Sequence, residues 1–344
     1  MSDPISPTAP NPGESPELAA PLAPEPPAKW AVPPTIGEVI TSGMTANTYT
    51  MGPEIGEGHF GRVFSCVDVW GNELAAKVMK PMGSYEKVKA STENEFRKLL
   101  LLRHPNVTYL YDAWEYRDTF YLVTERCAWS LTELISQEWF QGPLWLRAIA
   151  RCLLQAVHFI HLNRYCHQDI HSGNIFAAFP RDEMGVEGQE QSQGRATIQF
   201  KLGDLGVAKL FDEVDATNTR NLGMLPPEAL DTSEFGPLDH RIDIYHCGLL
   251  LLQVALSKEI RFTEEEIRVG KPRELALQLP RPLDSALEKT LRRHVASRTA
   301  NAMELWRDLS FPELPENPQP EQLILSDAPI ASDTGVSEHP STDH

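Results

Sequence analysis

Two side chains in the second half of the chain have the types and spacing that transfer of a phosphoryl group to a hydroxyl requires. Asp169 could orient an incoming hydroxyl and accept its proton, and Asn174, five residues later, could bind a magnesium ion. Such a pair means little alone, because an Asp and an Asn at this spacing occur by chance in many chains. Its position gives it weight, since it follows a predicted helix and precedes a Gly-Asp-Leu-Gly turn at 203–206.

A glycine-rich run nearer the start of the chain has the composition of a loop that contacts phosphates. The run Gly-Glu-Gly-His-Phe-Gly occupies residues 56–61. In a dinucleotide-binding fold such glycines precede a helix, whereas here a strand follows them, so we expect the bend of a β-hairpin. Because glycine has no Cβ, backbone N–H groups of this bend could approach phosphates closely. The ammonium of Lys77 on the next strand could neutralise the same phosphates.

Strands and helices at defined places must position these groups. Residues 62–69 and 74–79 predict two strands joined by a turn at Gly71-Asn72. Residues 91–103 predict a helix that ends before a His-Pro pair. An amphipathic helix should precede the candidate catalytic pair, because an apolar stripe is formed by Leu146, Ile149, Ala150, Leu153, Leu154, Val157 and Ile160.

In this order, over about 260 residues, the motifs resemble those of the eukaryotic-type (serine/threonine) protein kinases. The glycine run is similar to the glycine-rich loop of that family, His-Gln-Asp at 167–169 to its H-R-D motif, and the turn at 203–206 to its D-F-G turn. The resemblance implies an α+β, two-lobed kinase fold, with a small, mostly antiparallel β N-lobe carrying one helix and a larger, mostly α-helical C-lobe. It places the N-lobe at about 48–126 and the C-lobe at about 127–310, with a polar loop insertion at about 181–194.

The resemblance implies roles for individual catalytic residues. Asp169 would act on the hydroxyl nucleophile, and Lys77 would contact the ATP phosphates while an ion pair with Glu95 holds it in place. Glu93 is the competing partner, but it lies on a different face of the helix, so we favour Glu95.

The nucleotide and metal sites also follow from the resemblance. Asn174 and Asp204 would hold Mg²⁺, and Thr124 would be the small gatekeeper of a deep back pocket. Val63 and Ala75 would cover the adenine from one side. The residues implied to bind ATP are Ile55, Gly56, Glu57, Gly58, His59, Phe60, Gly61, Val63, Ala75, Lys77, Thr124, Glu125, Cys127 and Phe176.

Further motifs imply structural anchors in the C-lobe. Pro226-Pro227-Glu228 is similar to the A-P-E end of the activation segment, and Arg298 fits the partner arginine of Glu228. Asp243 begins a segment similar to the buried helix that anchors the catalytic loop.

The sequence departs from the family pattern in three places. Gln168 replaces the arginine that normally receives an activation-loop phosphate, so we hypothesise activity without loop phosphorylation. His171 replaces the usual lysine, and Asn221 replaces the threonine that this lysine meets, which suggests a substituted His171–Asn221 hydrogen bond. Asn174 and Asp204 are thirty positions apart, which is where the insertion arises.

Charge and proline are concentrated at the ends of the chain. The formal charge of the chain is −17, of which residues 1–47 contribute −4 and residues 311–344 contribute −7. We expect residues 1–47 to be a disordered, proline-rich tail and 311–344 a disordered, acidic tail, because neither has enough apolar surface to offset chain entropy. Pro-x-x-Pro patterns in both tails could bind protein partners that read proline motifs.

Composition excludes several classes of protein. The acidic balance argues against binding nucleic acid or an anionic membrane, and no apolar run is long enough to span a bilayer. No secretory signal begins the chain, which favours a cytoplasmic location. The five cysteines lie inside periodic apolar segments, which indicates reduced thiols rather than a disulfide framework.

The sequence therefore favours a protein kinase that transfers the γ-phosphate of MgATP to Ser or Thr hydroxyls of protein substrates. One alternative is a pseudokinase-like signalling scaffold, although the Lys and the two Asp that such proteins usually lose are present. A second alternative is a small-molecule phosphotransferase, which rests only on His171.

Overall fold

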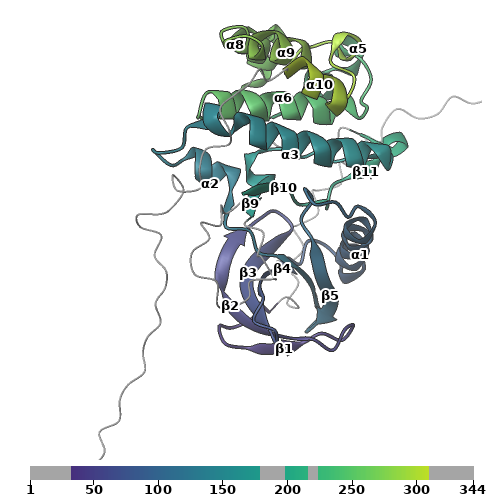
Figure 1. The fold of residues 1–344 in the computed structure, drawn as a ribbon. Coiled ribbons are helices and arrows are strands. Elements are labelled where there is room, and N and C mark those ends of the chain that lie inside the picture. The colour runs from purple at the N-terminus through teal and green to yellow at the C-terminus, as the bar shows by residue number, and fades with distance from the viewer. Residues whose placement is uncertain (1–31, 179–197, 216–223, 310–344) are drawn as a thin grey trace, which may run out of the picture.

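A computed structural model describes residues 32–178, 198–215 and 224–309 of the chain. These residues form two lobes (Figure 1). The cleft that contains the candidate site is lined by residues of both lobes. The tail residues 1–31 and 310–344, the predicted insertion at 181–194 and Asn221 lie outside the described residues.

The N-lobe is a six-stranded antiparallel sheet with strand order β1-β2-β3-β4-β6-β5. Its strands are β1 (Val39–Thr41), β2 (Thr48–Glu57), β3 (Gly61–Asp68), β4 (Glu73–Met79), β5 (Leu110–Tyr116) and β6 (Thr119–Glu125). The predicted hairpin is confirmed as β3 and β4, and Gly71 in its turn has φ 77°. Such a positive φ favours glycine.

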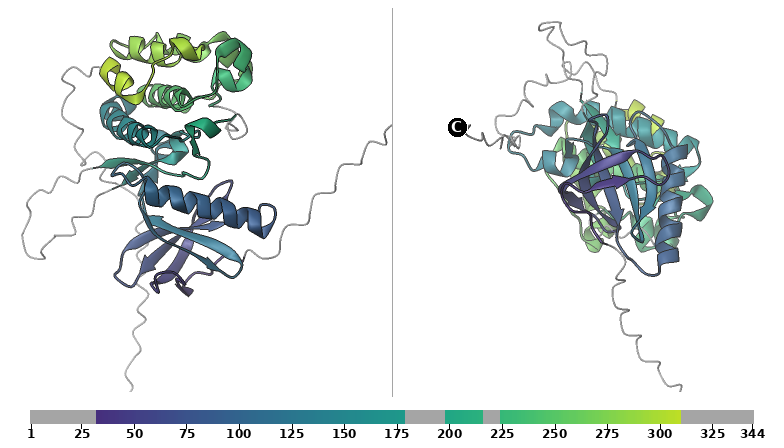
Figure 2. Two further views of the ribbon diagram at one scale, coloured as in Figure 1. Left: turned by 90° about the vertical axis from the view of Figure 1, so that its right-hand side faces the viewer. Right: turned by 90° about the horizontal axis from the view of Figure 1, so that it is seen from below.

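One helix, α1 (Tyr85–Leu101), packs on the N-lobe sheet against β5 and β6. Figure 2 (left) shows α1 on the side of the sheet that faces the C-lobe. The helix begins six residues before the predicted start at residue 91, because the side chain of Ser84 caps it by accepting a hydrogen bond from the N–H of Lys87.

The predicted boundary of the N-terminal tail at residue 47 is wrong. Val39–Thr41 pairs with Thr48–Thr50 as β1, and Ile40 is only 1% exposed within an apolar cluster that includes Tyr49. Three β-branched or aliphatic residues in a row favour an edge strand once a neighbouring strand is available. The fold therefore begins before residue 48.

The C-lobe is mostly helical, and its two longest helices, α3 and α6, pack against each other (Figure 1). Its helices are α2 (Leu131–Ile135), α3 (Gly142–Leu162), α4 (Pro227–Leu230), α5 (Thr232–Phe235), α6 (Arg241–Ala255), α7 (Glu264–Val269), α8 (Lys271–Ala276), α9 (Leu283–Thr290) and α10 (Ala302–Leu309), with 3-10 turns η1 (Ser172–Asn174), η2 (Phe211–Glu213) and η4 (Val295–Ser297). The predicted apolar stripe of α3 is confirmed, since all seven of its residues are buried.

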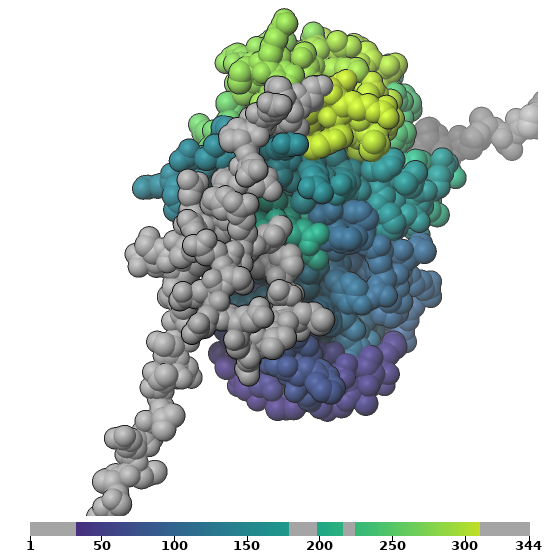
Figure 3. Space-filling model, viewed as in Figure 1, coloured from purple at the N-terminus to yellow at the C-terminus, as the bar shows by residue number. Residues whose placement is uncertain are grey.

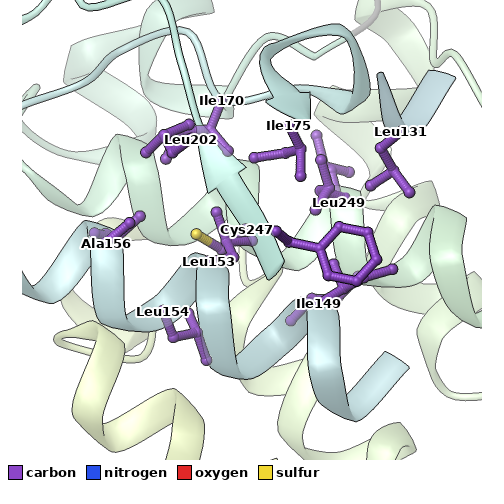
Figure 4. Close-up of a cluster of buried hydrophobic side chains, with 14 of the residues drawn as sticks. Leu131, Ile149, Leu153, Leu154, Ala156, Ile170, Ile175, Leu202, Cys247 and Leu249 are labelled. Carbon is purple, nitrogen blue, oxygen red and sulfur yellow. The ribbon is translucent and has the colours of Figure 1, made fainter. Parts of the chain in front are cut away.

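Short strands connect the C-lobe helices to the cleft. The three-stranded sheet has the order β10-β9-β7 and is formed by β7 (Trp129–Ser130), β9 (Ile175–Ala178) and β10 (Gln199–Leu202), and a second pair is formed by β8 (Tyr165–Cys166) and β11 (Lys209–Leu210). Figure 4 shows Ile170, Ile175 and Leu202 among the buried side chains of this region. Ile170 lies within the candidate catalytic loop, Ile175 directly follows it, and Leu202 directly precedes the Gly-Asp-Leu-Gly turn. Their burial therefore fixes the backbone at both segments.

Within the described residues, the apolar core forms two clusters. The smaller cluster lies within the N-lobe sheet, and the larger one is continuous from Met79, Leu99 and Leu122 of the N-lobe to Leu309 of the C-lobe. The space-filling view shows the N-lobe (purple and blue) against the teal part of the C-lobe, with the green and yellow part of the C-lobe farther away (Figure 3). No helix in the described ranges has the length and apolarity to cross a membrane.

Candidate active site

A cleft of about 430 Å³ lies between the two lobes. Every residue implied to bind ATP lines it, from Ile55 in the glycine-rich loop to Phe176 on β9, together with Glu95, Asn174 and Asp204. The structure thus brings into one cleft residues that are up to 149 positions apart in the sequence, as from Ile55 to Asp204. The cleft is also lined by residues that were not among the predicted site residues, namely Leu99, Thr108, Leu122, Arg126, Ala128, Trp129, Ser130, Glu133, Gly173 and Gly203.

The glycine-rich run forms the predicted bend between β2 and β3. Its turn is closed by a hydrogen bond of 2.9 Å from the N–H of Gly58 to the carbonyl of Gly61, and the ammonium of Lys80 donates to the carbonyl of Gly58 at 2.8 Å. A Cβ on Gly61 would lie 2.8 Å from the carbonyl oxygen of Val78 on β4, so only glycine fits there without a shift. The loop therefore lies close over β4, the strand that carries Lys77.

The predicted ion pair between Lys77 and Glu95 is confirmed. The ammonium of Lys77 donates to Glu95 Oε1 at 2.8 Å and to Asp204 Oδ1 at 3.2 Å. Burial by itself would lower the pKa of Lys77, but the carboxylates of Glu95 and Asp204 outweigh burial and raise the pKa. The competing residue, Glu93, instead forms an ion pair with Arg97 at the surface.

A buried carboxylate holds the backbone of the candidate catalytic loop. Asp243 on α6 accepts hydrogen bonds from the N–H groups of His167 at 2.7 Å and Gln168 at 2.8 Å, and its carboxylate also lies 2.8 Å from His161 Nε2. Burial opposes ionisation of Asp243, but these hydrogen bonds and the nearby histidines lower its pKa. The predicted anchor of the loop by α6 is therefore confirmed.

Within the loop, Asn174 and Asp169 contact each other directly. Asn174 Nδ2 donates to the backbone carbonyl of Asp169 at 2.9 Å and to its Oδ2 at 3.3 Å. Burial would raise the pKa of Asp169, but His171 and further histidines lower it, so the carboxylate is ionised and can accept a proton. A carboxylate that is ionised and held by an amide in this way suits a general base.

His171 lies beside Asp169 in the described part of the loop. Its Nδ1 accepts a hydrogen bond from the N–H of Gly173 at 3.1 Å, so the proton of a neutral ring is on Nε2, which lies 3.6 Å from Asp169 Oδ2. The expected partner, Asn221, is outside the described residues, so that hydrogen bond stays a prediction.

The turn at 203–206 presents Asp204 to the cleft with a backbone that few residues adopt. Asp204 has φ 57°, in the left-handed region, and its Oδ1 accepts a hydrogen bond from the N–H of Gly206 at 3.2 Å. Leu205 is fully buried in the larger apolar cluster, which also contains Leu99. Non-glycine residues keep such a backbone only where their surroundings hold it, and such positions cluster at functional sites.

The family model for the protein kinase domain matches residues 49–305 of the chain. The chain belongs to the protein kinase family.

Individual relatives agree with this assignment. The chain is 28% identical over 216 residues to a probable serine/threonine-protein kinase zyg-1 of Caenorhabditis briggsae, which is 61% of this chain and 27% of that protein. It is 27% identical over 208 residues to serine/threonine-protein kinase 36 of Pongo abelii, with 59% of this chain and 14% of that protein covered. It is 29% identical over 210 residues to serine/threonine-protein kinase TAO2 of Homo sapiens, with 60% of this chain and 15% of that protein covered. This kinase chain thus matches about a quarter or less of the length of these curated relatives.

The kinase cleft has a floor in which Gly203 and Phe176 fit together. A Cβ on Gly203 would lie 2.6 Å from Phe176 Cε2 and 3.2 Å from Thr108 Cγ2. The glycine therefore leaves room for the aromatic ring that lines the cleft from the C-lobe.

Replacing Gly203 with alanine should weaken ATP binding about tenfold, because the ring of Phe176 must move into the cleft and such overpacking costs about 1–3 kcal/mol. Binding of ATP by calorimetry measures the effect. The double variant Gly203→Ala/Phe176→Leu should recover part of the affinity, since leucine leaves space for the new methyl group but lacks the ring that lines the cleft. If the single variant binds ATP as tightly as the wild type does, the position of the Phe176 ring does not depend on the absence of a side chain at Gly203.

The end of the activation segment is anchored deep in the C-lobe. Arg298 donates to both carboxylate oxygens of Glu228, at 2.6 Å and 2.7 Å, and both side chains are 0% exposed. The predicted pairing of these two residues is confirmed.

Proposed function

We propose that this kinase domain transfers the γ-phosphoryl group of MgATP to Ser or Thr hydroxyls of protein substrates. The observation that carries the proposal is the contact of Lys77 with both Glu95 (2.8 Å) and Asp204 (3.2 Å), since it joins α1, β4 and the Asp204 turn across one cleft. Relatives named as serine/threonine-protein kinases support the choice of acceptor.

The donor groups at the cleft suit Mg²⁺. Asp204 and Asn174 both line it and supply carboxylate and amide oxygens, the hard ligands that this ion prefers. When bound, Mg²⁺ would neutralise charge on the phosphates. Lys77 would bind the same phosphates, the glycine-rich loop would cover them and exclude water, and Asp169 would orient the hydroxyl and accept its proton.

A transfer assay tests this function. The purified chain is incubated with Mg²⁺ and ATP labelled on the γ-phosphate, with general protein substrates and with a panel of small hydroxyl compounds, beside the variant Lys77→Met. Label on protein Ser or Thr from the wild type alone supports the proposal. Label on small molecules alone would favour a small-molecule phosphotransferase, and no transfer by the wild type would favour a scaffold.

We also propose that the kinase needs no phosphate on its activation segment. Gln168, in place of the phosphate-binding arginine, is 1% exposed, and its Nε2 donates to the carbonyl of Val207 at 3.1 Å. The segment also supplies its own anion, because Lys209 donates to Asp215 at 2.8 Å. Gln168 thus leaves no cation at the position of the family's arginine, and Lys209 is already paired with a carboxylate of the chain.

Phosphatase treatment should therefore leave the rate of transfer within about twofold of the untreated rate. The reason is that Gln168 is neutral and already bonded to a carbonyl, so it offers no charge to an added phosphate. Mass spectrometry verifies that phosphate has been removed, and a heat-inactivated phosphatase serves as the control. A rate that collapses on treatment, and returns on preincubation with ATP, would contradict phosphate independence.

A further inference from the structure

A lysine that the proposed chemistry does not use is buried behind the Asp204 turn. Lys98 lies on α1 three residues after Glu95, and it is only 4% exposed. Its ammonium donates to the backbone carbonyls of Leu205 at 3.3 Å and Gly206 at 3.2 Å. In the described part of the chain, both acceptors are neutral carbonyl oxygens and neither is a carboxylate.

A buried ammonium without a carboxylate partner is unfavourable for the stability of a fold. Burial lowers the pKa of Lys98 to about 8, although Glu95, Glu213 and Asp204 favour its charged form, and Lys209 opposes it. An aliphatic side chain on this face of α1 would avoid the desolvation of the charge. The contacts of Lys98 must therefore contribute something other than stability.

Those contacts complete a set of side-chain donors around one short backbone segment. The carbonyl of Gly203 accepts from His167 Nε2 at 3.0 Å, those of Leu205 and Gly206 accept from Lys98, and that of Val207 accepts from Gln168. Four carbonyls in total, one before Asp204 and three after it, are thus bound by buried side chains of α1 and the catalytic loop. This arrangement restrains the turn in the left-handed backbone that directs Asp204 at Lys77.

We propose that Lys98 is a positioning residue that holds the 204–206 turn in its metal-binding orientation and so keeps the cleft assembled without a phosphorylated activation segment. This inference rests on the proposed function. Lys98 acts through Asp204 and does not touch the nucleotide cleft, since it is absent from the residues that line it. Lys98 connects α1 to the turn directly. The first connection is indirect, since Glu95 of α1 binds Lys77, which in turn binds Asp204.

The test compares nucleotide binding with and without the metal in the full chain. Calorimetry gives the Kd of ATP in Mg²⁺ and in EDTA, and the Kd of adenosine, for the wild type, Lys98→Met, Lys98→Arg and the control Lys89→Met, an exposed lysine of the same helix. In Lys98→Met we expect the tightening of ATP binding by Mg²⁺ to fall about tenfold, with adenosine affinity within about twofold of the wild type. Lys98→Arg should restore part of the effect, and Lys89→Met should behave as the wild type.

Thermal unfolding separates a positioning role from a structural one. Removing a desolvated charge favours the fold, whereas losing two hydrogen bonds to carbonyls opposes it, so Lys98→Met should unfold close to the temperature of the wild type. The inference is overturned if Lys98→Met keeps the full effect of Mg²⁺, loses adenosine affinity by the same factor, or unfolds at a clearly lower temperature. If Mg²⁺ has no effect on ATP binding by the wild type and no transfer occurs, the proposed function fails and this inference fails with it.

Discussion

Replacing Asp169 with asparagine should lower kcat for phosphoryl transfer by about 10³-fold and leave the Kd of MgATP within about twofold. Asparagine has the same shape but cannot accept the proton of the hydroxyl. The variant keeps the backbone carbonyl that Asn174 contacts, and the loop stays anchored through Asp243. The loss should therefore appear in the chemical step alone.

Single-turnover transfer from labelled ATP gives the rate, and calorimetry gives the affinity for MgATP. The matched control is Asp212→Asn, the same substitution at a side chain that is 92% exposed in the same lobe, which should change neither quantity. A kcat for Asp169→Asn within tenfold of the wild-type value would show that another group accepts the proton.

Replacing Arg298 with methionine should lower the free energy of unfolding by about 3–5 kcal/mol. The reason is that the carboxylate of Glu228 would stay fully buried without its partner. Arg298 also donates to the carbonyls of Arg292 at 3.1 Å and Arg241 at 3.2 Å, so the substitution frees further buried acceptors. Removing both charges in Glu228→Leu/Arg298→Met should recover part of the loss, because no unpaired charge remains.

Urea unfolding measures these changes. An exposed pair provides the comparison, since Lys271 and Glu274 are 51% and 61% exposed and Lys271→Met should change stability by less than about 1 kcal/mol. Equal effects of Arg298→Met and Lys271→Met would mean that burial of the Glu228 pair contributes nothing.

The sequence predicted well those features of the kinase that depend on residue type and on spacing along a short stretch of chain. The β3–β4 turn is marked by Gly71, and Glu95 could be preferred to Glu93 because the two lie on different faces of one helix. The larger fold followed from the order of such motifs, each of which is local.

What the sequence did not predict depends on contacts between distant residues. Ile40 is buried because its strand pairs with β2, and this pairing is not visible in the sequence around it, which resembles a polar tail. The early start of α1, by contrast, could have been predicted from Ser84, because serine is a common N-cap residue. Lys98 sits on a face that the apolar pattern marks as buried, but nothing in the sequence shows that it meets two carbonyls 107 and 108 positions away.

The larger apolar cluster crosses from one lobe to the other, and this has a consequence for how the kinase loses its structure. Leu99 and Leu122 of the N-lobe and Ile170, Ile175 and Leu202 around the catalytic loop belong to the same cluster. Separate opening of either side would expose apolar surface on both. We therefore expect the candidate catalytic loop to open mainly by global unfolding together with this cluster, and the edge of the sheet at β1 to fray while the cluster stays folded.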